Sequence, residues 1–204
     1  MTRMKKVTLE SMTEAQREAY QVILASRTPG QLTDQQAETY KDILGTTDQK
    51  FNLGGPFTAF LKSPSLATRA ADIAKFLRFG TCLSPRQVEL AIIITARFWT
   101  AQYEWYAHAK FAATAGVEDQ IIQDIKENKR PEFANPDDDT VYEFCRELHV
   151  EHQVTDQTYQ RGVELLGEQG VVELIGLIGF YTMVSMTLNT IKVSVPEGEE
   201  LPPT

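Results

Sequence analysis

The stretch between Glu89 and His108 carries the residues whose types and spacing best suit proton transfer. Four residues recur there at intervals of four, three and four positions: Arg97, Ala101, Glu104 and His108. This spacing places them on one face of a helix, so Glu104 and His108 are expected to be in contact. A carboxylate favours the cation of a neighbouring imidazole, whereas burial favours the neutral form of both groups. Such a pair can hold a proton near neutral pH, as a general acid or base must.

Aromatic and cationic residues near this pair are candidates for substrate binding. Trp105 and Tyr106 are expected to line a pocket for a flat, unsaturated substrate, and Arg97 or Arg86 to hold a carboxylate. A purely structural interpretation also stands. The aromatic side chains suit a hydrophobic core, and Arg97 suits a role in balancing Glu89 or Glu104.

Composition limits the class of protein. The chain has 204 residues, of which 42% are hydrophobic and 24% charged, which is typical of a soluble globular protein with one main domain. A formal net charge of −8 argues against nucleic acid or an anionic membrane as the partner, because both require a basic surface. No apolar stretch follows the basic residues of the amino terminus, so we expect no secretory signal and a cytoplasmic location.

Cysteines and histidines give little indication of a metal site. Cys82 and Cys145 form no Cys-x-x-Cys motif, and both are expected to be buried thiols. His149 and His152 have a spacing that can bind metal, but the acidic residues beside them are more typical of a solvated helix end. The aspartates at 137–139 suit the start of a helix. We therefore expect no metal.

The fold class is predicted to be all-α. Three parts are expected: a helical extension over 1–50 packed on the core, a main domain over 51–190 and a flexible tail over 191–204. The glycine-containing break at 51–57 suits a pocket rim. Helices are predicted, from hydrophobic periodicity and end signals, over residues 13–24, 32–44 (a near repeat of the first), 65–79, 86–99 (capped by Ser84), 100–115 (capped by Thr100), 137–152, 156–166 and 171–189.

The run from 171 to 188 reaches the lower length limit for crossing a bilayer. We expect no membrane span, because Glu173 interrupts the run and no clusters of Lys or Arg flank it. Its small residues Gly176, Gly179 and Ser185 suit close helix packing in a core or a subunit interface.

An internal repeat divides the main domain into two related helical halves. Residues 87–94 parallel residues 171–178, which aligns Glu89 with Glu173. Leu188 and Lys192 stand where the first half has Glu104 and His108. One catalytic half and one structural half are therefore expected.

Several motifs occur together in the order of a known family. They are Gly-Pro-Phe at 55–57, Arg-x-x-Glu-Leu at 86–90, Glu-x-x-x-His at 104–108 and the glycine at 116, with nineteen residues separating Glu89 from His108. Over about residues 51–190 the chain resembles the carboxymuconolactone decarboxylase family, which includes the alkylhydroperoxidase D branch. The resemblance implies an alkylhydroperoxidase D-like helical bundle, and homo-oligomers that are commonly trimers or hexamers. It also assigns His108 and Glu89 to the family's site positions.

The two branches of that family differ in their chemistry. The peroxidase branch has two cysteines, seven and four positions before the histidine, where this chain has Ala101 and Glu104. Thiol peroxidase activity is therefore disfavoured, since that reaction consumes a thiolate pair. The decarboxylase branch removes carbon dioxide from an unsaturated lactone acid without metal or organic cofactor, and the chain is closer to this non-thiol branch. Its aromatic-rich stretch over 98–106 departs from the small decarboxylases.

Three functions remain open from the sequence. The leading one is a cofactor-independent lyase or isomerase that acts on a small unsaturated carboxylic acid or lactone, with proton transfer by His108, Glu104 and Glu89. The second is a catalytically silent helical oligomer that binds a hydrophobic molecule or a partner helix through a surface between Trp99 and Trp105. The third is a redox role for the two cysteines.

Overall fold

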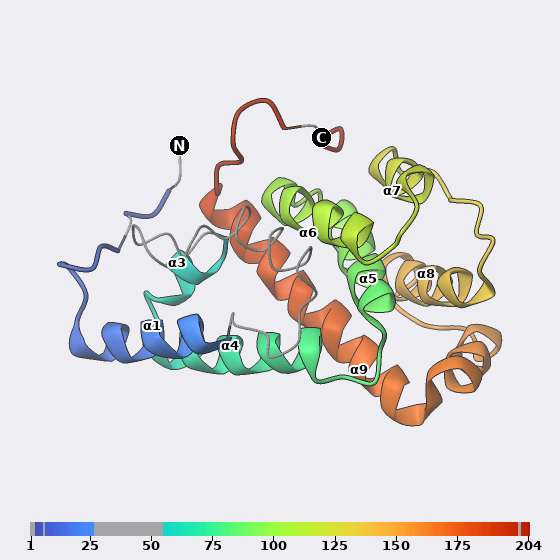
Figure 1. Cartoon of the computed structure of the whole chain (residues 1–204), viewed down its shortest axis with the longest axis horizontal. Helices are drawn as coiled ribbons and strands as arrows, with labels where there is room; N and C mark the ends of the chain where they lie inside the picture. The colour runs from blue at the N-terminus through green and yellow to red at the C-terminus, as the bar shows by residue number, and fades with distance from the viewer. Residues whose placement is uncertain (1–2, 6, 27–54, 200) are drawn as a thin grey trace.

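The computed structural model describes residues 3–5, 7–26, 55–199 and 201–204. All regular structure in this part of the chain is helical, which confirms the predicted all-α class. The predicted helix over 32–44, and with it the near repeat of 13–24, lies outside the described residues. The helices are α1 (Glu14–Ser26), α3 (Phe57–Phe60), α4 (Pro64–Phe79), α5 (Pro85–Phe98), α6 (Gln102–Thr114), α7 (Asp119–Lys126), α8 (Pro136–Val150) and α9 (Asp156–Ile191) (Figure 1).

Helix α5 is the central element of the fold. It contacts α6, α8 and α9 and lies among them in Figure 1. Every residue from Val88 to Ala96 is buried, as expected of a helix that is apolar on nearly all sides. Its start agrees with the prediction, because Ser84 and Gln87 form a reciprocal capping box and Pro85 occupies the first turn. α5 is thus the core helix on which the other elements pack.

Helices α1 and α4 pack against each other at one end of the molecule. Thr13 and Gln16 cap α1 reciprocally through their side chains and backbone amides, and Gly80 ends α4, as the sequence predicts. The predicted cap at Thr100 is wrong. Thr100 has a φ of 48°, its amide bonds the Arg97 carbonyl at the end of α5, and Ala101 occupies the N-cap of α6.

Helix α9 changes direction at a single glycine. Gly167 has φ 70° and ψ 170°, a backbone conformation that is essentially restricted to glycine, and Figure 1 shows the bend between the two parts of the helix. The sequence predicted two helices separated by residues 167–170. The structure reduces this interruption to Gly167 and extends the second part to Ile191.

The apolar second part of α9 crosses the core. By length and composition α9 could span a membrane, but more than half of its apolar stretch is buried within the protein. Glu173, which interrupts that stretch, accepts a hydrogen bond of 2.7 Å from the backbone amide of Cys82. Ser185 is fully buried and an added Cβ at Gly176 would lie 3.5 Å from Leu77, whereas no described atom would lie within 4 Å of one at Gly179.

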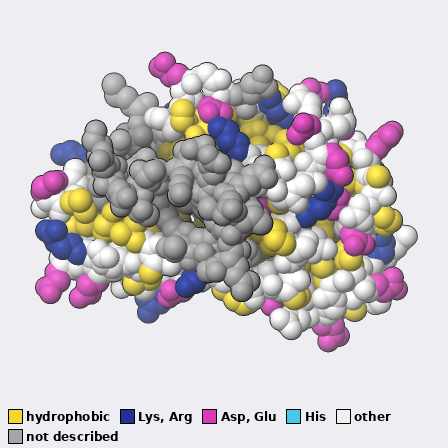
Figure 2. All heavy atoms as spheres, viewed as in Figure 1, with side chains coloured by type: hydrophobic (Ala, Val, Ile, Leu, Met, Phe, Trp, Pro, Cys, Tyr) yellow, Lys and Arg dark blue, Asp and Glu magenta, His cyan; other side chains and the backbone are white. Residues whose placement is uncertain are grey.

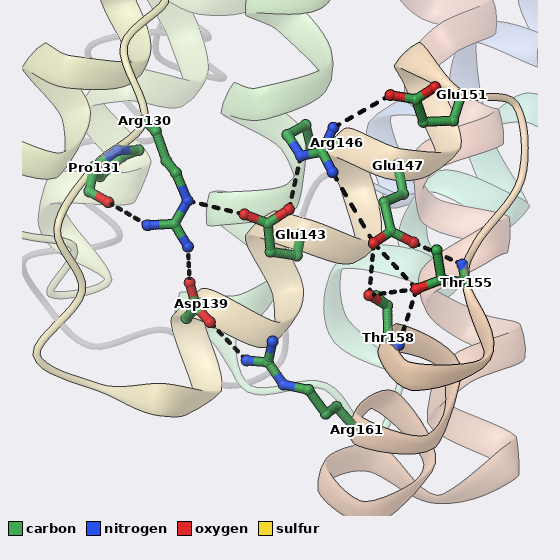
Figure 3. A network of polar contacts seen from close by, with 10 residues as sticks. All are labelled: Arg130, Pro131, Asp139, Glu143, Arg146, Glu147, Glu151, Thr155, Thr158 and Arg161. Atoms are coloured by element: carbon green, nitrogen blue, oxygen red, sulfur yellow. Dashed lines mark hydrogen bonds and ion pairs between the residues drawn. The ribbon is translucent and has the colours of Figure 1, made fainter.

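A polar network fixes the start of α9 against α8 (Figure 3). Glu147 of α8 accepts hydrogen bonds of 2.7 Å from the Thr155 amide and from the Thr158 hydroxyl. Asp139 accepts from Arg161 of α9 at 2.6 Å and from Arg130. This network joins the start of α9 to α8 and to the loop that precedes α8.

The carboxyl-terminal tail contacts α6. Gln102 donates to the carbonyl of Pro202 at 3.1 Å, and Lys110 pairs with Glu199 at 2.8 Å. On the face shown in Figure 2, Lys and Arg side chains are dispersed among Asp and Glu over the described surface.

Substitution of Gly167 by alanine is expected to destabilise the protein by about 1–3 kcal/mol, because only the backbone conformation opposes a side chain there. The matched control is Gly179→Ala, where the added methyl also meets no described atom but the backbone is helical. This control is expected to be neutral or to stabilise by about 0.5–1 kcal/mol. Urea unfolding of both variants measures the difference, and equal effects would contradict the assignment of the bend.

Candidate active site

Helices α5 and α6 bring two carboxylates to one imidazole. His108 Nδ1 lies 2.7 Å from Glu89 Oε2, and His108 Nε2 lies 3.3 Å from Glu104 Oε1. The predicted contact between Glu104 and His108 is therefore present. Glu89 and His108, nineteen positions apart in the sequence, are brought into contact by the packing of α5 on α6. All three side chains are buried, with residue exposures of 6%, 3% and 7% for Glu89, Glu104 and His108.

Arg78 of α4 completes this arrangement. Its guanidinium donates to Glu89 Oε1 at 3.0 Å, so each oxygen of Glu89 has a cationic or hydrogen-bonding partner. Sequence reasoning missed Arg78. Its only sequence signal is its position in the last turn of α4, where a basic residue also suits the helix dipole. Nothing in its spacing indicates contact with a residue on the next helix.

The two carboxyl groups are placed in opposite electrostatic environments. Burial opposes ionisation of Glu89, but the charges and hydrogen bonds of His108 and Arg78 outweigh it, and the pKa of Glu89 is lowered. Burial dominates at Glu104, and although His108 and Arg78 counteract it, the pKa of Glu104 is raised to about 7. Carboxyls whose pKa values are separated in this way take different roles in acid–base catalysis.

The ionised state of Glu89 fixes the orientation of His108. A carboxylate can only accept a hydrogen bond, so Nδ1 of the imidazole must carry the proton that it shares with Glu89. Nε2 then faces Glu104, the carboxyl group whose pKa is raised to about 7. The ring is held edge-on by Tyr181, at a centroid distance of 5.1 Å, and by Phe111 at 5.5 Å.

This cluster forms part of the wall of a cavity. The space along this wall amounts to about 730 Å³, and part of it is open solvent. Glu104 and His108 line the cavity, as do the cationic residues Lys75 and Arg78 of α4. Most of the remaining lining is apolar, with aromatic side chains contributed by Phe57, Phe79, Tyr103, Phe111, Phe180 and Tyr181.

The predicted rim at residues 51–57 agrees with the cavity in its described part. Gly55, Pro56 and Phe57 line the opening, and Gly55 has a φ of +54°. A Cβ added at Gly55 would lie 3.1 Å from the Tyr103 ring, so glycine permits both the turn and the close approach. Residues 51–54 lie outside the described part.

The structure does not bring the predicted carboxylate-binding arginines to this cavity. Arg86 pairs with the buried Asp138 and with Glu118, and these contacts raise its pKa. Arg97 donates to the Lys126 carbonyl at 2.9 Å. The sequence argument treated 97–108 as one helical face, but the break at residues 99–101 interrupts the helical register between Arg97 and α6.

Trp105 and Tyr106 also lie outside the cavity lining. Trp105 is buried in the hydrophobic core, and Tyr106 is half-buried beneath the ammonium of Lys110. The face of α6 that lines the cavity carries Tyr103, Glu104, Ala107, His108 and Phe111. Their successive spacings of one, three, one and three positions fit one side of a helix.

The remaining histidines and the two cysteines lie outside the cavity lining. His149 is buried, stacks on Phe98 and lies 3.0 Å from the Thr95 hydroxyl, and burial lowers its pKa to about 4. Its predicted place at a solvated helix end is therefore wrong, whereas His152 follows the end of α8.

Cys145 is buried as predicted, but Cys82 is exposed. Among the described residues, no group of three or more His, Cys, Asp or Glu side chains is arranged to hold a metal ion.

Comparison with known proteins adds no family assignment: no protein-family model matches the chain, and no curated protein matches it.

Glu104→Gln is expected to stabilise the protein at pH 8 and to change its stability little at pH 4. The folded-state pKa of Glu104 is raised from 4.5 to about 7, so the folded protein binds more protons than the unfolded chain between these values. Stability contributed by this group therefore falls as pH rises through that interval, by on the order of 3 kcal/mol in total. The isosteric amide removes this dependence.

Glu89→Gln is the matched comparison, because the lowered pKa of Glu89 has the opposite sign. Its ionised form is favoured in the folded state, so the substitution is expected to destabilise the protein at pH 8 and less so as the pH falls below the ordinary carboxyl range. Urea unfolding across pH 3–8 measures both variants. The same direction of change in both at pH 8 would contradict the assigned ionisation states.

Proposed function

We propose that this protein is a cofactor-independent lyase or isomerase that acts on a small unsaturated carboxylic acid or lactone. One observation carries the proposal: an ionised Glu89 holds His108, whose other nitrogen faces a carboxyl group with a pKa of about 7 in an aromatic-lined cavity. A group that titrates near neutral pH beside a fixed imidazole is suited to give or take a proton at a carbon atom.

The chemistry balances without a further reactant. In a decarboxylation, the bond to the carboxylate carbon breaks, carbon dioxide leaves, and the electron pair delocalises into a dienolate. A proton from Glu104 or His108 Nε2 is delivered to carbon, and the donor regains its proton from water. In an isomerisation, the same pair removes a proton from one carbon and returns it to another. Arg78 and Glu89 keep the imidazole oriented during either reaction.

We further propose that the chain belongs to the non-thiol branch of the carboxymuconolactone decarboxylase family and has its alkylhydroperoxidase D-like fold. The contact between Glu89 and His108 supports this, because the resemblance assigns these two residues to the family's site. The all-helical structure is compatible with it. A cytoplasmic homo-oligomer, as a trimer or hexamer, with a small molecule as its ligand and without metal or cofactor, is part of the same proposal.

The alternative is a catalytically silent protein that binds a hydrophobic small molecule. The apolar character of the cavity favours it. The surface between Trp99 and Trp105 does not serve this role, because Trp105 is buried and the Trp99 indole donates to Thr182. A redox role is disfavoured, since neither Cys82 nor Cys145 lines the cavity and burial raises the pKa of Cys145.

The test is turnover of a panel of unsaturated lactones and acids, including carboxymuconolactone, followed by carbon dioxide release, ultraviolet absorbance and uptake of deuterium from heavy water. His108→Gln and Glu104→Gln are each expected to lower turnover by about 10²–10⁴-fold. His149→Gln is the matched control, because this buried histidine lies outside the cavity. Turnover that persists in His108→Gln would refute the proposal, and ligand binding without turnover would support the silent alternative.

The pH profile assigns the role of Glu104. If its protonated form delivers the proton, kcat/KM is level below pH 7 and falls about tenfold per pH unit above it, because the acid form is depleted there. Glu104→Gln is expected to remove this limb. A profile that instead rises through pH 7 would show that Glu104 acts as the base.

A further inference from the structure

Two cations from the same face of α4 line the cavity, one turn apart. Arg78, the inner one, donates to Glu89 at 3.0 Å, and its guanidinium lies over the Phe111 ring at 5.0 Å. Its charge is therefore used to balance a buried carboxylate. If a substrate carboxylate competed for Arg78, Glu89 would lose an ionic partner in a buried setting, which is costly.

Lys75 differs from Arg78 in its surroundings. It precedes Arg78 by three residues, about 4.5 Å along the helix axis, and its side chain is exposed at the cavity. Lys75 forms no ion pair with any residue that the structure describes, whereas Lys110 and Lys129 each pair with a glutamate. Its ammonium is thus available to an anion that enters the cavity.

The inner end of the cavity disfavours an anion. Glu89 is ionised, and Glu104 lies in the same buried cluster and also carries a negative charge once it is ionised. Apart from these groups and the two cations, the lining is mostly apolar and aromatic, and an unpaired carboxylate would be poorly solvated against it. A ligand with one carboxylate is therefore directed with that group toward Lys75 and its apolar body toward His108.

We propose that Lys75 is the residue that binds the substrate carboxylate, and that the substrate is a flat, unsaturated monocarboxylate that keeps this carboxyl group during the reaction. This inference rests on the proposed function in that it concerns the same cavity. Because the carboxylate binds Lys75 and not the acid–base pair, the carbon atoms that face His108 and Glu104 are those of the unsaturated body. Within the proposed chemistry, this arrangement favours proton relocation over loss of carbon dioxide.

The experiment measures binding of three planar probes by titration calorimetry at pH 7.5: cinnamate, its neutral analogue cinnamamide and the dianion 4-carboxycinnamate, with sorbate as a non-aromatic monocarboxylate. Lys75→Met is expected to weaken cinnamate and sorbate by about tenfold or more and to leave cinnamamide unchanged, since a charged hydrogen bond is lost. Lys75→Arg is expected to retain most of the affinity. Lys62→Met, an exposed lysine outside the cavity lining, is the matched control and should bind like the wild type.

Equal affinity of the monocarboxylates for the wild type and Lys75→Met would overturn the inference. So would binding of 4-carboxycinnamate as tight as that of cinnamate, or failure of both monocarboxylates to bind the wild type at millimolar concentration. Proton exchange with heavy water, measured on the same acids, separates this inference from the proposed function. If monocarboxylates bind in a Lys75-dependent manner but no member of the panel exchanges a carbon-bound proton with heavy water, the proposed function fails and the binding assignment stands. Turnover of acids that is unaffected by Lys75→Met overturns the binding assignment alone.

Discussion

The buried chain of polar contacts from Arg78 through Glu89 and His108 to Glu104 is the constraint on which the site depends. Its members come from three helices, α4, α5 and α6. A buried carboxylate without partners is costly, so the three helices must pack in a register that supplies a partner to each oxygen of Glu89. The geometry needed for stability is also the geometry that orients the imidazole.

Glu89 and Glu104 show how position alone gives two chemically equal carboxyl groups different pKa values. Glu89 has both a cation and the imidazole as hydrogen-bonding neighbours, and its pKa is lowered. Glu104 has a single contact to His108 at 3.3 Å and is more affected by burial, and its pKa rises to about 7. The first group is suited to orienting His108 and the second to exchanging a proton, which is the physical basis of the proposed function.

The polar site is supported by an apolar frame. α5 is buried along most of its length, and it packs against α6, which carries part of the site, and against α8 and α9, which carry the ionic network. His149 belongs to this frame. It is buried against Phe98 and Thr95 at the α5–α8 contact, and its lowered pKa keeps it neutral at neutral pH. A histidine in this setting contributes to packing, whereas His108 lies at the wall of a cavity.

The sequence alone determined the all-helical class, most helix ends and the pairing of Glu104 with His108. Each of these depends on neighbours within a turn or two: the capping box at Ser84 and Gln87, the glycine after α4, and the four-residue spacing on α6. Only the tertiary structure decided which groups from different helices meet. The sequence did not indicate Arg78 as a site residue, and the structure places Arg86 and Arg97 outside the cavity for which they were predicted. Helical periodicity gives no information across the points where the chain turns. No spacing in the sequence specifies the angle at which two helices pack.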